Sequence, residues 1–389
     1  MKFLLMVCFS LLLETSCGYE DQLLNEELLA ALGADPIGTS NLEYKSIIVD
    51  EDTILLMPVV PFSYATAQGG PGDNTPVNNP ITDTGAALGK VLFYDRQLSL
   101  NHTRSCGSCH IQSKGFADGL ALSEGFAGEL TKRNSMSLAN SRFYENGRFF
   151  WDERALTLEE QVLMPIQDER EMGLNLEEAV ARISSSDYYV DLFIAAFGDS
   201  VVNSDRISLA LAQFVRSLDS FGSHFDQVSG PRRPGRGGPP GPGQGLSELE
   251  EQGRRLFFSR RTNCARCHEG RALAADQARN NGLPILNEDF GKALATSDAN
   301  EVNKFKVPSL KNIEVTGPYM HDGRFESLEE VVEHYNSGVV ASGNLDNRLR
   351  LALGLNDGEK AALVAFMKTF TDHLFLNDPR FSDPFQRSK

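Results

Sequence analysis

Apolar residues recur at intervals of three and four positions along most of the chain, and strand-like alternation is rare. Residues 206–218, RISLALAQFVRSL, have a spacing that is typical of a helix with one buried face. Several such runs start with the spacing of a capping box, in which Ser, Thr or Asn precedes Glu by three positions. These starts are TLEE at 157–160, NLEE at 175–178, SELE at 247–250 and SLEE at 327–330. The pattern predicts a mainly α-helical protein.

The first seventeen residues have the pattern of an export signal. Lys2 is followed by an apolar run from Phe3 to Leu13, which is too short to span a bilayer and typical of a signal peptide. Thr15 and Ser16 then precede Cys17, as small residues do at a bacterial lipoprotein cleavage site. We therefore expect residues 1–17 to be a signal peptide, the protein to reach the periplasm or cell envelope, and a lipid on Cys17 to anchor it to the membrane.

The rest of the chain divides around a segment that cannot form a core. Residues 229–245, SGPRRPGRGGPPGPGQG, are almost entirely Gly, Pro and Arg and are typical of a linker or surface loop. GKVLFYDRQLSLNHTRSCGSCH precedes this segment and GRRLFFSRRTNCARCH follows it, so a module is repeated. We predict an N-terminal extension at 18–81, a first domain at 82–228 and a second at 246–380.

Charge and cysteine spacing narrow the function. A formal net charge of −16 argues against nucleic acid as a partner, because polyphosphate would be repelled. Beyond the signal and cleavage site, the cysteines form two CxxC pairs, 106/109 and 264/267. Zinc ribbons usually place their pairs 15–20 residues apart, and two local disulfides would not require a neighbouring histidine. Here each pair is followed at once by a histidine, His110 or His268.

The spacing CxxCH is the attachment motif of covalent c-type haem. The two thiols bond to the porphyrin and the adjacent imidazole becomes an iron ligand. We therefore predict two covalently bound haem c groups. Cys106, Cys109 and His110 would hold the first, and Cys264, Cys267 and His268 the second.

Longer motifs resemble the bacterial di-haem cytochrome c peroxidase and MauG superfamily. The resemblance covers roughly residues 82–376 and includes LGKVLFYDRQLS, KRNSMSLAN, FFWDERALTLEEQVLMPIQDEREMG and FKVPSLKNIEVTGPYMHDGRFESLEEVVEHYNSG. It implies two c-type cytochrome-like helical domains, each binding one covalent haem, with a calcium ion at the interface between them. It also implies an oxidoreductase that uses hydrogen peroxide at the first haem.

The resemblance carries several residue roles onto this sequence. Trp151, in FFWDER, matches a tryptophan that couples the two haems, and Gln161, Pro165 and Glu171 match the peroxide side of the first haem. A carboxyl group such as Glu171 can move a proton between the peroxide oxygens, and burial would raise its pKa toward the working range. Calcium ligands are implied at Asn134 and at the backbone carbonyls of Thr316 and Pro318.

The residues opposite the two histidines are the least conventional part of the pattern. Family peroxidases use a methionine fourteen residues after the histidine of PYMH, and Tyr335 stands there, as in MauG-type enzymes. Met320 remains an alternative ligand, and His334 is expected on an exposed face. For the first haem, the family's second histidine would fall near Phe126, but residues 111–133 contain no histidine. His102 is too near His110 to replace it, so we expect an open site for peroxide.

Three functions follow. The first is a di-haem peroxidase that reduces hydrogen peroxide with electrons from a small cytochrome or copper protein. The second is MauG-like, peroxide-dependent oxidation of amino-acid side chains on a partner protein. The third is a non-catalytic di-haem electron-transfer cytochrome, in which both irons would have two protein ligands.

Overall fold

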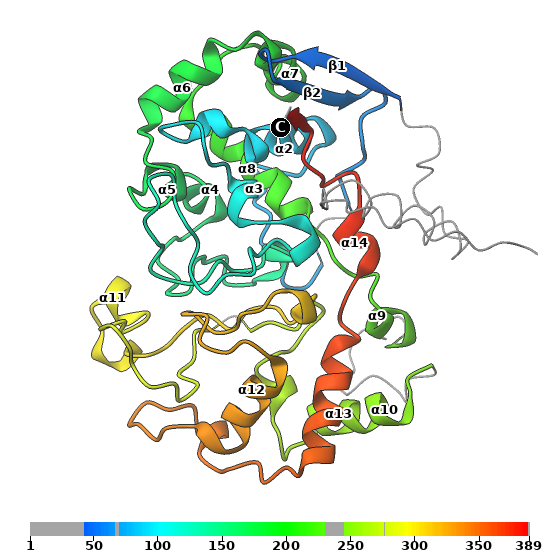
Figure 1. The fold of residues 1–389 in the computed structure, drawn as a ribbon, viewed down its shortest axis with the longest axis vertical. Helices are drawn as coiled ribbons and strands as arrows, with labels where there is room; N and C mark the ends of the chain where they lie inside the picture. The colour runs from blue at the N-terminus through cyan, green and yellow to red at the C-terminus, as the bar shows by residue number, and fades with distance from the viewer. Residues whose placement is uncertain (1–42, 67–69, 230–244, 276, 388–389) are drawn as a thin grey trace, which may run out of the picture. The chain divides into compact units, whose positions relative to one another are not determined.

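The chain folds mainly into helices that are joined by long irregular segments (Figure 1). A computed structural model describes residues 43–66, 70–229, 245–275 and 277–387. The expected signal peptide with Cys17, most of the N-terminal extension and nearly all of the Gly/Pro/Arg segment lie outside the described residues. Of the described residues, 46–57 and 61 onward form one compact unit.

The helices of the first half come before the Gly/Pro/Arg segment, and those of the second half come after it. They are α2 (Asp83–Tyr94), α3 (Cys106–Cys109), α4 (Leu158–Gln161), α5 (Met164–Gln167), α6 (Leu176–Ser184), α7 (Asp187–Phe197), α8 (Ser204–Ser217), α9 (His224–Ser229), α10 (Glu248–Phe257), α11 (Ala293–Thr296), α12 (Leu328–Glu333), α13 (Asp357–Lys368) and α14 (His373–Asn377). A π-helical turn, His334–Gly338, extends α12. Short 3-10 turns occur at Arg96–Leu98, Gln112–Lys114, Ser141–Phe143, Cys264–Arg266, Ala299–Glu301, Ile313–Val315 and Asn347–Leu349.

All four predicted capped starts are helix N-termini. Thr157, Asn175, Ser247 and Ser327 each accept a hydrogen bond from the backbone N–H three residues later, and they begin α4, α6, α10 and α12. The predicted helix at 206–218 corresponds to α8, whose residues from Ile207 to Ser217 are nearly all buried. The predicted helical character is therefore confirmed, and a small sheet accompanies it.

Each half is organised around one pair of crossing helices. In the first half α2 packs against α8, and in the second half α10 packs against α13. A side chain at Gly89 of α2 would lie 2.0 Å from the Ala210 carbonyl oxygen, and one at Gly253 of α10 would lie 1.9 Å from the Ala362 carbonyl oxygen. Both positions therefore require glycine, because only a residue without Cβ lets the two backbones approach this closely. The repeat seen in the sequence is thus also a repeat of packing.

A three-stranded sheet joins the beginning and the end of the described chain. Its order is β1 (Tyr44–Ile48), β2 (Thr53–Pro58) and β3 (Phe385–Arg387), and β2 pairs antiparallel with β3 so that Leu55 lies opposite Phe385. The sequence prediction starts compact structure near Thr82, whereas Leu55 and Tyr64 are already buried core residues. Their partners lie more than 300 residues away, which no local pattern reveals.

The C-terminal segment after α13 packs against the first half. Lys90 Nζ donates to the Pro379 carbonyl (2.9 Å), and Tyr94 Oη donates to the Phe381 carbonyl (2.7 Å). Gln112 Nε2 donates to the Asp378 carbonyl (2.8 Å). Residues 378–387, which follow the predicted second domain almost entirely, thus complete the surroundings of α2 and of the first CxxCH motif.

The second half has its own aromatic and aliphatic core. Phe257 of α10 and Phe366 and Phe370 of the α13 region make edge-to-face contacts with centroids 5.0–5.7 Å apart. Leu328, Val332 and Leu363 belong to the same buried cluster, and Tyr335 packs against it. Among the described residues, no helix has the length and apolar character needed to cross a membrane.

Candidate functional site

The first CxxCH motif forms a single helical turn that directs its histidine inward. Ser105 and Ser108 cap α3 reciprocally, and His110 follows the turn directly. His110 Nδ1 lies 2.8 Å from the Phe116 carbonyl oxygen and 3.3 Å from Ser135 Oγ. Because a carbonyl can only accept, Nδ1 carries the proton, and the lone pair of Nε2 is available to a metal. Burial lowers the pKa of His110, which keeps the imidazole neutral.

The second motif has the same arrangement in a looser form. Cys264 begins a 3-10 turn, and His268 Nδ1 lies 3.2 Å from the Leu273 carbonyl oxygen. Burial lowers the pKa of His268 to about 4, so this imidazole is also neutral. Both motifs therefore present a neutral imidazole, and the hydrogen bond of its Nδ1 atom is shorter in the first half.

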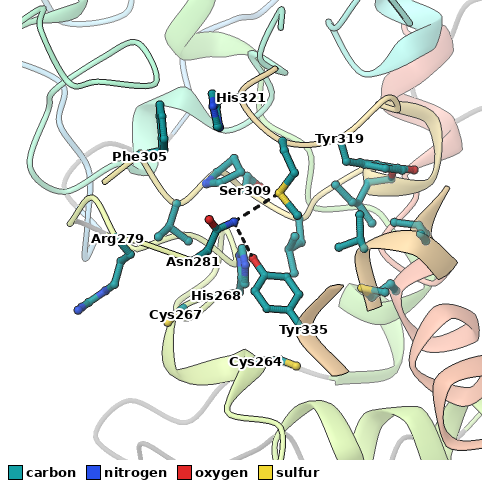
Figure 2. A pocket seen from close by; sticks show the side chains of 18 of the residues that line it. Cys264, Cys267, His268, Arg279, Asn281, Phe305, Ser309, Tyr319, His321 and Tyr335 are labelled. Atoms are coloured by element: carbon teal, nitrogen blue, oxygen red, sulfur yellow. Dashed lines mark hydrogen bonds between the residues drawn. The ribbon is translucent and has the colours of Figure 1, made fainter. Parts of the chain in front are cut away.

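A cavity lies against the second motif (Figure 2). Its walls are mostly apolar, and they include Leu328, Val331, Val332, Leu353, Leu363 and Met367. Two buried polar atoms that also face this region, Arg279 Nε and Asn263 Oδ1, have no hydrogen-bond partner among the described residues. Two thiols, a neutral imidazole, apolar walls and an unpaired guanidinium nitrogen fit a covalently attached haem with its carboxylates.

The other uses of the cysteines are not supported. Cys106, Cys109, Cys264 and Cys267 form no disulfide. Within the described part of the chain, no group of three or more His, Cys, Asp or Glu residues is arranged to hold a metal ion, so the two pairs do not build a zinc site.

Tyr335 and Met320 both line the cavity of the second motif. Asn281 Nδ2 lies 3.4 Å from Tyr335 Oη and 3.5 Å from Met320 Sδ, so one amide contacts both expected ligands (Figure 2). The Leu283 N–H donates to Asn281 Oδ1 (3.4 Å), which turns the nitrogen of the amide toward the cavity. Burial raises the pKa of Tyr335 to about 12 in the absence of a metal.

His334 differs from the expectation. The sequence places it on an exposed face, but it is buried and its Nε2 lies 3.1 Å from the Asn281 carbonyl oxygen. The reason is tertiary packing, because the Asn281 backbone lies over this side of the helix and the Phe325 ring contacts the imidazole with a centroid distance of 5.5 Å. His334 therefore supports the Asn281 backbone instead of facing solvent.

Trp151 lies where segments of the two halves meet at this cavity. Its indole Nε1 donates to the Asn134 carbonyl (2.9 Å), and the Asn134 N–H donates to the His321 carbonyl (2.8 Å). The Trp151 and His321 rings are in edge contact at 6.5 Å, and His321 stacks on Phe305 at 3.6 Å. Trp151 is thus fixed by both hydrogen bonding and ring contact.

The expected calcium ligands gather at the same cavity. Asn134, Thr316 and Pro318 all line it. Asn134 Nδ2 donates to the Leu120 carbonyl (2.8 Å), which leaves its side-chain oxygen available. One amide oxygen and two backbone carbonyls are a donor set that suits calcium when waters complete the coordination.

The expected peroxide-side residues lie on one stretch of the first half. Gln161 ends α4, and Pro165 lies in the first turn of α5. The Pro165 carbonyl accepts from the Met172 N–H (3.2 Å), so this helix holds the loop that carries Glu171. Burial, followed by repulsion from Asp168, raises the pKa of Glu171 to about 7. Burial raises the pKa of both cysteine thiols of the first motif, and the charge of Glu171 adds to this effect.

Phe126 is adjacent to the loop that carries Glu171. The Phe126 N–H donates to the Glu171 carbonyl (2.9 Å), whereas His102 is exposed and has a positive φ of 60°. The backbone of Phe126 therefore contacts the loop that carries Glu171, and the open site at the first haem stays a prediction. Sequence reasoning missed Asn281 and the hairpin around Phe126, because neither has a motif that marks it.

The comparisons with known proteins point to di-haem peroxidases and MauG proteins. The family model of di-haem cytochrome c peroxidases matches residues 83–232. The methylamine utilization protein MauG of Methylophilus methylotrophus is 32% identical over 296 residues, which cover 76% of this chain and 84% of that protein. The cytochrome c551 peroxidase of Nitrosomonas europaea is 34% identical over 291 residues, which cover 74% of this chain and 79% of that protein.

Solved structures show the same similarity. A MauG-like protein associated with microbial copper homeostasis has a TM-score of 0.70 and 33% identity, over 83% of this chain and 99% of that chain. The diheme peroxidase BthA from Burkholderia thailandensis shares the fold, with a TM-score of 0.66 and 21% identity over 88% of this chain and 97% of that one.

Proposed function

This chain belongs to the di-haem cytochrome c peroxidase family that includes MauG, and from that premise we propose how its residues divide the work. It is an oxidoreductase of the peroxidase type with two haem c groups. We assign residues 82–228 and 246–380 to two c-type cytochrome-like domains, with 229–245 as the linker. The two helix pairs with their matching glycines support this division.

The first haem is held by Cys106, Cys109 and His110, and the second by Cys264, Cys267 and His268. When bound, each haem iron supplies one-electron oxidation and reduction, and the first supplies the binding position for peroxide. The chain itself supplies neutral imidazoles whose Nδ1 atoms are hydrogen-bonded to carbonyls. This fixes both rings with Nε2 turned away from the backbone.

Glu171 is the proton carrier of the reaction. Hydrogen peroxide takes up two electrons and two protons and leaves as two water molecules. A carboxyl group with a pKa of about 7 is able both to accept and to return a proton near neutral pH. Its carboxylate has no hydrogen-bond partner among the described residues, so it is available to peroxide. Gln161 and Pro165 shape the same side of the site.

Trp151 carries electrons between the two haems, and calcium stabilises its surroundings. Asn134 links the two roles, since its backbone carbonyl accepts from the indole and its side-chain oxygen is one of the calcium ligands. The carbonyls of Thr316 and Pro318 are the others. Removing calcium would therefore loosen the segment that fixes the tryptophan.

Tyr335 would be the second iron ligand of the second haem, and Met320 is the alternative ligand. The Asn281 amide donates toward the tyrosine oxygen, which supports an anionic oxygen ligand there. Such a ligand favours the ferric state and lowers the reduction potential relative to a His/Met haem.

The electrons come from a small cytochrome or copper protein, and the enzyme works in the periplasm or cell envelope. The export signal at residues 1–17 supports this location, and a lipid on Cys17 would tether the enzyme to the membrane. The net charge of −16 disfavours nucleic acid as a partner.

The observation that carries the proposal is the half-buried carboxyl of Glu171, whose loop is joined to the segment before the first CxxCH motif by the bond from the Leu100 N–H to the Met172 carbonyl (2.8 Å). Glu171→Gln should slow the reaction of the ferric di-haem protein with peroxide by roughly 10²–10⁴-fold in stopped-flow measurements. Glu169→Gln, two residues away on the surface, is the matched control and should react at the parent rate. Equal rates for all three proteins at equal haem content would remove Glu171 from the mechanism.

A second candidate is MauG-like oxidation of side chains on a partner protein. It is favoured by the tyrosine in the cavity of the second motif and by the similarity to a MauG-like protein of known structure. Peroxide titration of the di-haem protein with and without reduced cytochrome c separates the two. Rapid turnover of the cytochrome supports the peroxidase, and a long-lived two-electron oxidised protein supports side-chain oxidation.

A further inference from the structure

Residues 123–131 form a small hairpin in the first half. Glu124 and Leu130 are paired antiparallel, and the Thr131 N–H donates to the Ser123 carbonyl (2.9 Å). At its tip the Gly125 N–H donates to the Glu129 carbonyl (2.8 Å). Ser123 Oγ donates to the buried Asp118 carboxylate (2.5 Å), which fixes the base of the hairpin. The segment is therefore a defined element and not an irregular loop.

The hairpin is bound to the loop that carries Glu171 by backbone contacts. The Phe126 N–H donates to the Glu171 carbonyl (2.9 Å), and Arg170 Nη1 donates to the Leu130 carbonyl (3.3 Å). Both bonds use main-chain groups of the hairpin, so they hold its backbone directly. Only the Phe126 bond reaches the peptide of Glu171 itself.

Two glycines allow this docking. A Cβ at Gly125 would lie 1.8 Å from the Arg170 carbonyl oxygen, and a Cβ at Gly173 would lie 2.3 Å from Cε1 of the Phe126 ring. Gly173 also has a φ of +67°, which favours glycine. The Phe126 ring therefore fills the space that a side chain at position 173 would need. The hairpin and the Glu171 loop are packed without a gap.

The other side of the hairpin is bound to the segment that leads into the first CxxCH motif. Asn101 Nδ2 donates to the Phe126 carbonyl (2.8 Å), Arg104 Nε donates to the Gly125 carbonyl (3.2 Å), and Arg104 pairs with Glu124 (3.0 Å). Arg104 is only two residues before Cys106. The hairpin thus bridges the haem-attachment segment and the Glu171 loop.

We propose that the 123–131 hairpin, acting through Phe126, is a positioning element of Glu171. The inference rests on the proposed role of Glu171 and adds a residue that acts through it. Because no described side chain bonds to the Glu171 carboxylate, its placement depends on the backbone that carries it. Phe126 holds that backbone by its N–H and by its ring, and Arg104 and Asn101 tie Phe126 to the haem-attachment segment.

The test compares Phe126→Ala, Glu171→Gln and the double variant in the ferric di-haem protein. The rate constant for peroxide should fall by about tenfold to a hundredfold in Phe126→Ala, as expected for a misplaced catalytic group. In the Glu171→Gln background the same change should alter the rate by less than about twofold, since the group that Phe126 positions is already gone. Leu130→Ala, a half-exposed position on the same hairpin, is the control and should keep the parent rate.

Amide hydrogen exchange gives a readout that is independent of activity. Phe126→Ala should speed exchange in residues 168–174, whereas Leu130→Ala should not. Should Phe126→Ala fail to incorporate both haems, Phe126→Leu and Gly173→Ala replace it. The leucine should restore part of the rate, and the alanine at 173 should lower it by displacing the ring.

The outcomes separate the two proposals. If Glu171→Gln slows the reaction and Phe126→Ala does not, the positioning role is wrong and the proposed function stands. An undiminished effect of Phe126→Ala in the double variant would also overturn it, because Phe126 would then act on peroxide directly. If Glu171→Gln itself leaves the rate unchanged, the assigned role of Glu171 fails first.

Discussion

The two CxxCH regions share a frame and differ in what faces their histidines. In both halves a glycine on one helix lies against an alanine carbonyl on the helix that crosses it, at Gly89 of α2 and Ala210 of α8 and at Gly253 of α10 and Ala362 of α13. In both, a backbone carbonyl accepts from the histidine Nδ1. The repeated part of the sequence is thus the part that carries the CxxCH motif and holds its histidine.

The surroundings of the histidines follow different plans. The first half adds Ser135 Oγ near Nδ1 and brings the carboxyl-bearing loop of Glu171 to the hairpin. The second half has an apolar cavity with a tyrosine, a methionine and an amide. The difference teaches that a duplicated scaffold specialises through the loops between its helices. We propose that one loop set provides proton transfer and that the other provides a second iron ligand.

Removing one attachment motif should have the largest effect on this comparison. The double change Cys264→Ser and Cys267→Ser should leave one covalent haem in place of two, because a porphyrin without thioether bonds is not retained through denaturation. Intact-protein mass spectrometry counts the haems directly. The equivalent change at Cys106 and Cys109 is the control, and it should remove the other haem only. A protein that still carried two covalent haems would contradict the assignment.

Changing the second ligand should affect one haem only. Tyr335→Phe should convert the second haem from low spin to high spin. It should also raise the reduction potential of this haem by on the order of 0.1 V, since an anionic oxygen ligand is lost. Met320→Leu should leave both properties unchanged. Electron paramagnetic resonance and redox titration measure the effect. The opposite result for the two variants would make Met320 the ligand.

The half-buried carboxyl of Glu171 in the first half should reduce stability as pH rises. The pKa of Glu171 is raised from 4.5 to about 7 in the folded protein, so folding favours the protonated form. Its contribution is fully present below pH 4.5 and is lost as pH rises through 7. Glu171→Gln should therefore be about 3 kcal/mol more stable than the parent at pH 8 and nearly equal to it at pH 4.

Urea unfolding at the two pH values measures this difference. Glu169→Gln should show no such pH dependence, because that side chain is exposed. A gain in Glu171→Gln that is the same at both pH values would point to packing instead of ionisation.

The shared frame should respond equally in both halves. Gly89→Ala and Gly253→Ala each insert a Cβ where only a carbonyl contact fits, and each should cost about 1–3 kcal/mol of unfolding free energy. Gly343→Ala, where nothing lies within 4 Å, is the control and should change stability by less than about 0.5 kcal/mol. A large effect in one half alone would mean that the two helix pairs are not equivalent.

The smallest expected effect concerns the hydrogen bond at the first histidine. Ser135 Oγ donates to the Cys109 carbonyl (2.8 Å), so its lone pairs face His110 Nδ1. Ser135→Ala should raise the potential of the first haem by about 20–60 mV, since a weak second acceptor for the imidazole proton is lost. Ser135→Thr should restore the parent value. A shift in the second haem would show that the effect is not local.

The sequence predicted the parts of this protein that depend on residues close together along the chain. Capped helix starts at Thr157 and Ser247 depend on residues three positions apart, and haem attachment depends on five, so both could be read directly. The pairing of β2 with β3 and the contact between Phe126 and Glu171 depend on residues that are far apart along the chain. The position of His334 was predicted wrongly because the Asn281 segment and the Phe325 ring, which bury it, lie outside its own helix. The roles of Trp151 and Asn134 came from resemblance, since geometry alone does not reveal electron transfer.

The packing of the C-terminal segment against the first half has a consequence for the order in which the protein folds. A chain is synthesised from its N-terminus, yet Lys90 and Tyr94 receive their backbone partners only from residues 379 and 381. The surroundings of α2 are therefore complete only after residue 381 has been synthesised, whereas α10 and α13 can pack together as soon as α13 has formed.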